Sequence, residues 1–201
     1  MRVVFFIKKA ISMYSYLFWT PINKISFTLN GIIYGKNLKC RGKIYTIFHS
    51  EQSKLEFGDC VFINSGDKQN PIGCGTRTYF QLFDEGKIQI GNGTGISNAA
   101  FTCYENICIG DHVMIGAGCK FYDTDFHPLD YKKRVFTKEK PKTAPIIVEE
   151  GVFIGAGSYI LKGVTIGKHS IVGAGSVVSK NIPANQIWAG APARYIKNIT
   201  E

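Results

Sequence analysis

The chain has 201 residues, 45% of them hydrophobic, and a formal net charge of +9. This length allows one good hydrophobic core and leaves no room for a second full domain. The charge predicts an anionic partner, such as a phosphate-bearing ligand, a membrane surface or a nucleic acid. The six cysteines form no CxxC pair, so they indicate neither a zinc site nor a thioredoxin-like motif, and we expect reduced thiols.

The N-terminal segment, MRVVFFIKKAISMYSYLFWT, is apolar but is interrupted by Lys8 and Lys9. Its uninterrupted apolar run is shorter than the about 20 residues that span a bilayer, and no small-residue cleavage site follows it. We expect residues 1–30 to form an amphipathic helix and a linker, with Thr20-Pro21 ending the helix. The helix would either contact a membrane surface or pack on the body or on an oligomer partner.

A repeat of six residues organises the rest of the chain. Its aliphatic anchors in the C-terminal half are Val148, Ile154, Ile160, Ile166, Val172 and Val178. A period of six fits neither a helix nor a series of hairpins, whereas three such units complete one turn of a triangular prism. We therefore predict an all-β fold, a parallel β-helix at residues 31–182 whose anchors point inward, followed by a short cap at residues 183–201 that covers one end.

Fainter copies of the repeat begin at Phe57, Ile90 and Ile109. Their spacing exceeds whole turns, which predicts two loop excursions, near residues 65–87 and near residues 123–146. His112 and His169 occupy the same position of the repeat, three residues after an anchor, where Cys60 and glycines also occur. We expect this position to accept any residue and both histidines to lie at the surface.

The second excursion opens with FYDTDFHPLD, in which His127 is the one histidine of a non-repeating loop. An imidazole has an unperturbed pKa of about 6.5, which suits a general base. Asp123 and Asp125 would orient this imidazole, bind a substrate or simply hold a turn. A basic cluster follows, either as a solvated loop or as a contact for an anionic substrate: Lys132, Lys133, Arg134, Lys138, Lys140 and Lys142.

Three stretches carry a resemblance to a known family. They are DTDFHPLD from Asp123, PIIVEEGVFIGAGSYILKGVTIGKHSIVGAGSVVSKNIP from Pro145 and AGAPARYI from Ala189. Together they resemble the hexapeptide-repeat acyltransferases, and among these the maltose, galactoside and capsular-polysaccharide O-acetyltransferases. The resemblance covers about residues 88–197. It implies a left-handed coil, against the usual hand of parallel connections, and a homotrimer with active sites between subunits.

The resemblance also implies transfer of acetyl from acetyl-CoA to a hydroxyl, without a metal. His127 matches the catalytic histidine, and Asn98 lies in the region of an asparagine that touches the acceptor, for which Asp123 and Asp125 are further candidates. The implied cofactor-binding residues are Phe153, at a position often occupied by Trp, Ala156 and Ala174 beside the pantetheine arm, and Ser179, Lys180 and Arg194 near the distal phosphates.

We expect a saccharide acceptor, belonging to a capsule or lipopolysaccharide or to a lipid-linked precursor, and a cytoplasmic enzyme, peripheral at the inner face of the membrane if the N-terminal helix binds there. The alternatives are a non-catalytic scaffold, a non-sugar acceptor, covalent catalysis by Cys103 or Cys119, and a zinc prism of the γ-carbonic-anhydrase type, which needs three converging histidines. A nucleic-acid partner is not expected, because charge alone suggests it.

Overall fold

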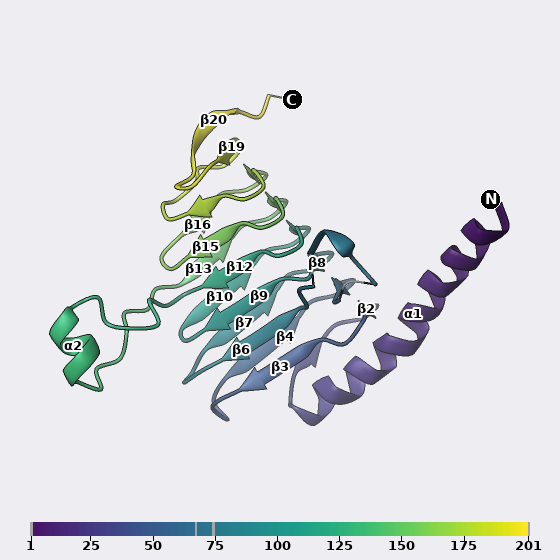
Figure 1. Ribbon diagram of the computed structural model, residues 1–201, viewed down its shortest axis with the longest axis horizontal. Helices are drawn as coiled ribbons and strands as arrows, with labels where there is room; N and C mark the ends of the chain where they lie inside the picture. The colour runs from purple at the N-terminus through teal and green to yellow at the C-terminus, as the bar shows by residue number, and fades with distance from the viewer. Residues whose placement is uncertain (1, 67, 74, 201) are drawn as a thin grey trace.

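The structure, a computed structural model, describes residues 2–66, 68–73 and 75–200, and the backbone alone for residues 2–13. A long helix, α1 (Arg2–Leu29), leads into a three-sided prism of short strands (Figure 1). The side chains of Lys8 and Lys9, on which part of the amphipathic prediction depends, lie outside the described residues. Within the described part of the chain, no helix is long and apolar enough to cross a membrane.

The prediction that α1 ends at Thr20-Pro21 is wrong, because the helix continues through Pro21 to Leu29. A proline inside a helix costs about 3 kcal/mol. Packing of the following turns offsets that cost: the Asn23 amide donates to the Gly42 carbonyl and its oxygen accepts from Ile44 N. Phe27 is fully buried and stacks on Phe57 with ring centroids 5.4 Å apart. The last turns of α1 therefore cover the N-terminal end of the prism core.

Three sheets form the sides of the prism. Sheet A contains β1 (Ile33–Tyr34), β4 (Lys54–Phe57), β7 (Lys87–Ile90), β10 (Asn106–Ile109), β13 (Ile146–Val148) and β16 (Thr165–Ile166). Sheet B contains β2 (Lys39–Arg41), β5 (Phe62–Asn64), β8 (Gly95–Ser97), β11 (Met114–Ile115), β14 (Phe153–Ile154), β17 (Ile171–Val172), β19 (Gln186–Ala189) and β20 (Arg194–Asn198). Sheet C contains β3 (Tyr45–Phe48), β6 (Tyr79–Leu82), β9 (Ala100–Cys103), β12 (Lys120–Tyr122), β15 (Tyr159–Leu161) and β18 (Val177–Val178).

The chain visits sheets A, B and C in turn, and neighbouring coils pair in parallel. The predicted anchors all point inward: Val148, Ile154, Ile160, Ile166, Val172 and Val178 are at most 1% exposed. An aromatic column fills the middle of the core, since the Phe101 ring stacks on Phe80 at 4.8 Å and on Phe121 at 4.5 Å. Each six-residue repeat therefore forms one side of the prism and directs its aliphatic anchor into the core.

The repeat position of His112 and His169 does not accept any residue, contrary to the prediction. Cys60, His112 and His169 have φ of 58°, 56° and 59° there, and glycine stands at the same position in other coils. The corner from sheet A to sheet B needs this left-handed conformation, which costs a non-glycine residue about 1 kcal/mol. Both histidines are exposed, as expected.

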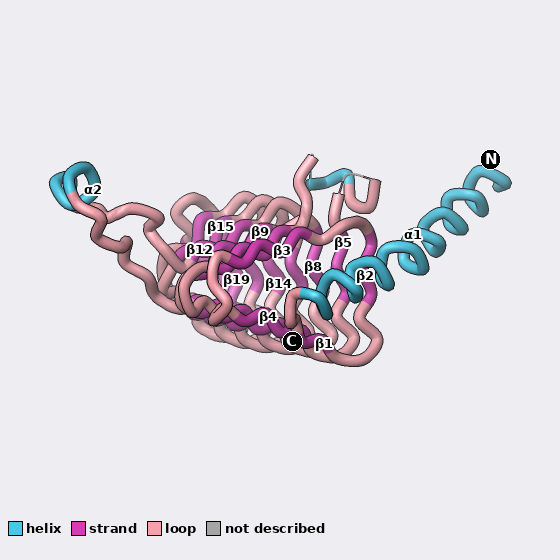
Figure 2. Tube along the Cα trace, turned by 90° about the horizontal axis from the view of Figure 1, so that it is seen from below, coloured by secondary structure: helices cyan, strands magenta, loops and turns pink. Residues whose placement is uncertain are grey.

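Two excursions leave the prism. The first, residues 65–78, connects β5 to β6, includes a 3₁₀ turn at Pro71–Gly73 and is shorter than the predicted range. The second, residues 123–145, connects β12 to β13 and carries α2 (Tyr131–Phe136) on an arm that extends away from the prism (Figures 1 and 2). At the C-terminal end β19 extends sheet B and β20 pairs with it antiparallel, so residues 183–198 continue the wall of the prism.

Candidate active site

The predicted site residues gather at two corners of the prism. Asn98, Ala156 and Ala174 lie at the turns from sheet B to sheet C, here called the BC corner, and Arg194 begins β20 beside that corner. Asp123, Asp125, His127, Ser179 and Lys180 lie at the turns from sheet C to sheet A, here called the CA corner. A strand of sheet C separates the corners by about 13 Å, at about 3.3 Å per residue. One chain therefore holds two half-sites that it does not itself bring together.

His127 is presented by a tight turn at the CA corner. Its backbone N–H donates to the Asp125 carbonyl at 2.7 Å, and Phe126 between them has a φ of 62°. A bulky residue in this conformation is strained, and such strain persists only where the surroundings impose it. Here the Thr124 hydroxyl accepts from Phe126 N at 3.1 Å, and the Tyr122 ring packs edge-on against the Phe126 ring. The turn leaves the His127 side chain exposed to solvent.

Asp123 is fully buried. Its carboxylate accepts from the backbone N–H groups of Tyr104, Glu105 and Asn106 at 2.8–3.1 Å, and the Cys103 thiol donates to it at 3.4 Å. Burial raises the pKa of Asp123, and these donors oppose that increase by stabilising the charged form. The side chain fastens the start of the second excursion to the corner of the preceding coil.

Asp125 is tied to the following coil. Its Oδ2 atom lies 3.4 Å from Nζ of Lys162, and the two side chains are 19% and 27% exposed. Its backbone N–H donates to the Lys142 carbonyl. This bond joins the outgoing and the returning segments of the arm where they leave the prism. Lys162 was not singled out from the sequence, because only the stacking of β15 above the second excursion brings it to Asp125.

Asn98 uses its amide inside the protein. It has a φ of 45° and is 1% exposed, its oxygen accepts from Gly66 N at 2.7 Å, and its NH₂ group donates to the Asn70 carbonyl at 2.9 Å. These bonds hold the first excursion against the BC corner. Asn98 thus shapes that half-site through the loop that it fixes.

The BC corner above Asn98 has almost no side chains. A Cβ atom on Gly116 would lie 2.6 Å from the Ala156 backbone, and one on Gly155 would lie 2.5 Å from the Ala174 backbone. Successive coils touch here through their backbones, which requires glycine, and Ala156 and Ala174 leave a smooth groove wall. Such a wall suits a long thin ligand such as a pantetheine arm. Phe153 lies apart from this wall, 43% exposed on the outer face of sheet B.

The distal candidates Ser179, Lys180 and Arg194 are exposed near the C-terminal end of the prism. Ser179 and Lys180 follow β18 at the CA corner, whereas Arg194 lies next to Ala193, whose N–H donates to the Val177 carbonyl. Arg194 therefore lies beside the start of β18, and Ser179 and Lys180 follow the end of the same strand.

The buried cysteines are poor nucleophiles. Burial raises the pKa of the Cys119 thiol to about 11, and burial together with the Asp123 carboxylate raises the pKa of the Cys103 thiol further. The thiolate is the reactive form, so neither residue is suited to covalent catalysis at neutral pH. Among the described residues, no group of three or more His, Cys, Asp or Glu side chains converges as a metal site would require.

Alkylation with iodoacetamide tests this assignment. At pH 7.5 we expect the exposed Cys60 to be modified at least about 100-fold faster than Cys40, Cys103 or Cys119, because burial protects those thiols and raises their pKa values. Mass spectrometry of the digested protein gives the rate at each residue. Fast modification of Cys103 or Cys119 in the folded protein would reopen the covalent alternative.

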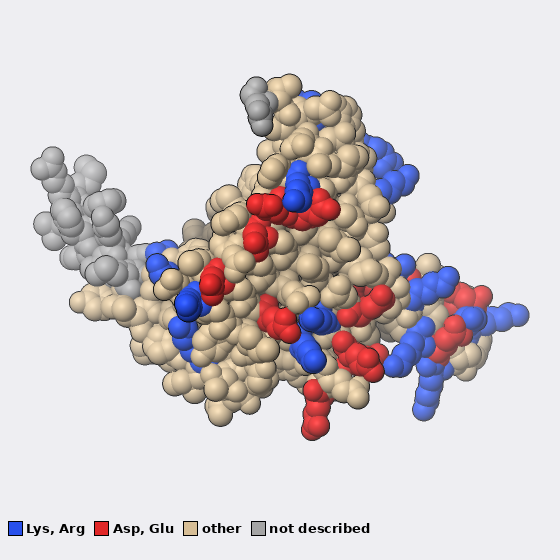
Figure 3. All heavy atoms as spheres, turned by 180° about the vertical axis from the view of Figure 1, so that it is seen from behind, with Lys and Arg blue, Asp and Glu red and all other residues tan. Residues whose placement is uncertain are grey.

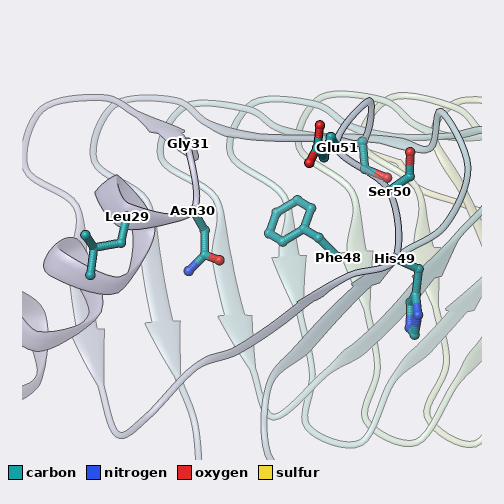
Figure 4. Close-up of a pocket in the computed structure, with 8 residues that line it drawn as sticks. Leu29, Asn30, Gly31, Phe48, His49, Ser50 and Glu51 are labelled. Atoms are coloured by element: carbon teal, nitrogen blue, oxygen red, sulfur yellow. The ribbon is translucent and has the colours of Figure 1, made fainter.

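One hollow near the other end of the prism contains no predicted site residue. It has a volume of 470 Å³ and lies between the end of α1 and the first CA turn, lined by Leu29, Asn30, Phe48, His49 and Glu51 among others. The His49 imidazole points away from Leu29 and Asn30 (Figure 4) and stacks on Phe83 at 4.0 Å. The polar groups do not converge, so the two corners remain the candidate site.

Comparison with known proteins agrees with this geometry. Residues 145–180 match the family described as bacterial transferase hexapeptide (six repeats). A galactoside O-acetyltransferase of Lactococcus lactis subsp. lactis is 40% identical over 114 residues, which cover 54% of this chain and 53% of that protein. The chain spans about half the length of the curated relatives that it matches.

Solved structures extend the comparison. A hexapeptide-repeat acetyltransferase from Vibrio cholerae O1 biovar eltor, complexed with acetyl coenzyme A, is 38% identical with a TM-score of 0.53 and covers 57% of this chain and 61% of that one. An N-acyltransferase from Bacillus cereus, in complex with dTDP and 3-hydroxybutyryl-CoA, is 24% identical with a TM-score of 0.67 and covers 92% and 90%, which shows the fold. The protein is a left-handed parallel β-helix of the hexapeptide-repeat type, as predicted. The resemblance to the hexapeptide-repeat acyltransferases is likewise confirmed.

Proposed function

We propose that the protein transfers acetyl from acetyl-CoA to a hydroxyl of a saccharide, with His127 as the general base. The observation that carries this proposal is an exposed imidazole, held by a strained turn, on a prism whose relatives are acetyltransferases. The test is release of free coenzyme A from acetyl-CoA in the presence of mono- and oligosaccharides. Binding of acetyl-CoA without release for any sugar would point to a lipid-linked acceptor, and no binding at all would favour the scaffold alternative.

The chemistry needs one base and one oxyanion donor. A neutral His127 ring nitrogen accepts the hydroxyl proton as the acceptor oxygen bonds to the thioester carbon, and the C–S bond then breaks as the imidazolium returns the proton to sulfur. Transfer is direct, so no covalent enzyme intermediate forms. A backbone N–H group stabilises the oxyanion between these steps. Holding both substrates in one groove supplies much of the remaining rate.

The two half-sites support assembly as a homotrimer. If the CA corner of one subunit faces the BC corner of its neighbour, His127 meets a groove whose wall contains Ala156 and Ala174. The arm that carries α2 has unpaired apolar surface for such contacts: Leu129, Tyr131, Val135 and Phe136 are more than half exposed. In this assembly Ala156 and Ala174 flank the pantetheine arm, Phe153 borders the channel, and Ser179, Lys180 and Arg194 meet the phosphates.

In this assignment Asn98, Asp123 and Asp125 position the acceptor site. Each uses its side chain within the protein, holding either the first excursion or the turn before His127. The basic cluster of the arm is partly neutralised by acidic neighbours, as Figure 3 shows, since Lys133 pairs with Glu139 and Lys140 with Asp84. The remaining cations of the arm would favour an anionic acceptor.

We further propose a role in the synthesis of a surface polysaccharide, with α1 resting on the membrane. The described part of α1 has an apolar stripe on its solvent side, at Tyr14, Leu17, Phe18, Ile22, Ile25 and Leu29, which are all at least 40% exposed. Lys39 lines the same hollow as Leu17 and would meet anionic head groups. The Lys24 ammonium lies over the Tyr34 ring, 5.5 Å from its centroid. An interfacial helix has this composition.

Vesicle sedimentation tests the membrane contact. Replacing Leu17, Phe18 and Ile25 with serine should reduce sedimentation with phosphatidylserine-containing vesicles at least about tenfold, because the stripe provides the buried apolar area. Deletion of residues 1–20 should do the same, but it would also remove the packing of Tyr16 on Phe62 and Arg41. The serine variant keeps that packing and should retain coenzyme A release. Equal sedimentation of the variant and the native protein would remove this role.

A further inference from the structure

A row of outward side chains on sheet C contains a gap one residue wide. Paired positions run from coil to coil through Tyr45, Tyr79, Ala100, Lys120, Tyr159 and Val177. Ala100 has the smallest side chain of the row and stands between the long side chains of Tyr79 and Lys120. The strands on either side of the Ala100 strand are about 10 Å apart, at about 4.8 Å per strand spacing, so the missing side chain leaves room for one flat ring. We call this space the Ala100 slot.

The slot has an aromatic wall. The Tyr79 ring stacks on the Tyr45 ring at 4.9 Å with an interplanar angle of 22°, so one face of Tyr79 is covered and the opposite face is directed along the row toward Ala100. Tyr79 is 37% exposed. The negative face of an aromatic ring attracts the weakly positive C–H groups of a pyranose. A sugar ring in the slot would continue the existing stack by one layer.

The slot also has uncompensated positive charge. Arg77 donates to the Tyr45 hydroxyl at 3.0 Å, and the Lys120 ammonium donates to the Tyr159 hydroxyl at 3.1 Å. Both cations are thus held by neutral groups. None of the salt bridges found among the described residues includes either of them. The hollow that Arg77, Tyr79, Ala100 and Lys120 line has a volume of 270 Å³, and no described acidic residue lines it.

We propose that the Ala100 slot binds an acidic pyranose, whose ring stacks on Tyr79 and whose carboxylate or phosphate is bound by Arg77 and Lys120. This inference deepens the proposed function and rests on it, because the slot adjoins Asn98 at the BC corner and would hold one unit of the acceptor. Charge-assisted hydrogen bonds to an anionic group are about twice as strong as neutral ones, so an acidic sugar is preferred over its neutral counterpart. Thr76 also lines the hollow; its hydroxyl donates to the Gly73 carbonyl at 2.7 Å, so its oxygen can accept a hydrogen bond from a sugar hydroxyl.

The test measures binding to the full chain without acetyl-CoA, by saturation-transfer NMR and titration. The probes are methyl glucuronoside, its neutral counterpart methyl glucoside, and glucose 6-phosphate. At least one anionic probe should bind about tenfold more tightly than methyl glucoside. The two anionic probes distinguish a carboxylate from a phosphate. Equal binding of charged and neutral probes, or displacement of a bound probe by ADP at the same concentration, would overturn the proposal, since ADP competition would make the slot part of a nucleotide site.

Three variants separate the walls of the slot. Ala100→Leu fills it from an outward position that leaves the core unchanged and should abolish binding, whereas Lys120→Gln and Arg77→Gln should each remove the preference for charge. Val177→Leu, on the same row three coils away, and Lys54→Gln, on sheet A, are the matched controls and should bind like the native protein. Unchanged probe binding by Ala100→Leu would overturn the assignment.

Binding and transfer are measured separately, so the two proposals can fail separately. If an acidic probe binds in the slot but no sugar is acetylated, the slot proposal stands and the acetyltransferase proposal is contradicted. If sugars are acetylated equally well by the Ala100→Leu variant, and acidic and neutral probes bind alike, the acetyltransferase proposal stands and the slot proposal is contradicted.

Discussion

Replacing His127 with alanine is expected to lower kcat for acetyl transfer by about 10²- to 10⁴-fold, the usual contribution of a positioned general base. The fold should be unaffected, because the side chain is exposed and its turn is held by backbone and Thr124 bonds. Binding of acetyl-CoA should also be unaffected, since His127 makes none of the proposed cofactor contacts. The measurement is coenzyme A release under saturating acetyl-CoA, together with direct cofactor binding.

His112→Asn is the matched control for this loss. His112 is exposed at a different corner, and asparagine tolerates its φ of 56°, so this variant should keep the native rate. A His127→Ala enzyme that retained more than a tenth of the native kcat would exclude His127 as the base. A loss of cofactor binding in the same variant would instead place His127 in the cofactor site.

Replacing Asp123 with alanine is expected to lower the free energy of unfolding by about 3 kcal/mol, because three backbone N–H groups lose the buried carboxylate that accepts from them. For a chain of this length the melting temperature should fall by about 6–12 °C. Asp123→Asn should not restore stability, since its NH₂ group would place further donors against the same N–H groups. Thermal unfolding at one protein concentration measures both effects.

Asp84→Ala supplies the comparison, since it removes an exposed ion pair with Lys140 and should change stability by less than about 1 kcal/mol. A substrate-binding role for Asp123 makes the opposite prediction. In that case the alanine variant would melt like the native protein and lose affinity for the acceptor alone.

The sequence by itself determined the prism and the position of the catalytic candidate. The period of six places Val148, Ile154 and the later anchors inside the prism. Each prism side gains stability by burying one aliphatic anchor, and this requirement recurs every six residues. The break in that period marks the loop that contains His127. These inferences need only the order of residues, since a repeated local pattern produces a repeated local structure.

The tertiary structure decided the roles that depend on partners distant in sequence. Pro21 stays within α1 because Asn23 and Phe27 are held by the first coils, and propensity alone does not include that packing. Asp123 and Asn98 are candidates for substrate contact from the sequence, with a turn-holding role as the alternative for Asp123. In the structure, backbone groups of the preceding coil bond the Asp123 carboxylate, and backbone groups of the first excursion bond the Asn98 amide.

The corner residues with positive φ between sheets A and B, and the Ala100 slot, likewise depend on how the coils stack. The space beside Ala100 exists because Tyr79 and Lys120 stand on the neighbouring strands, 21 and 20 residues away along the chain. Hydrogen bonds and cavities are properties of groups that folding brings together. They could not be assigned until the register of every coil was known.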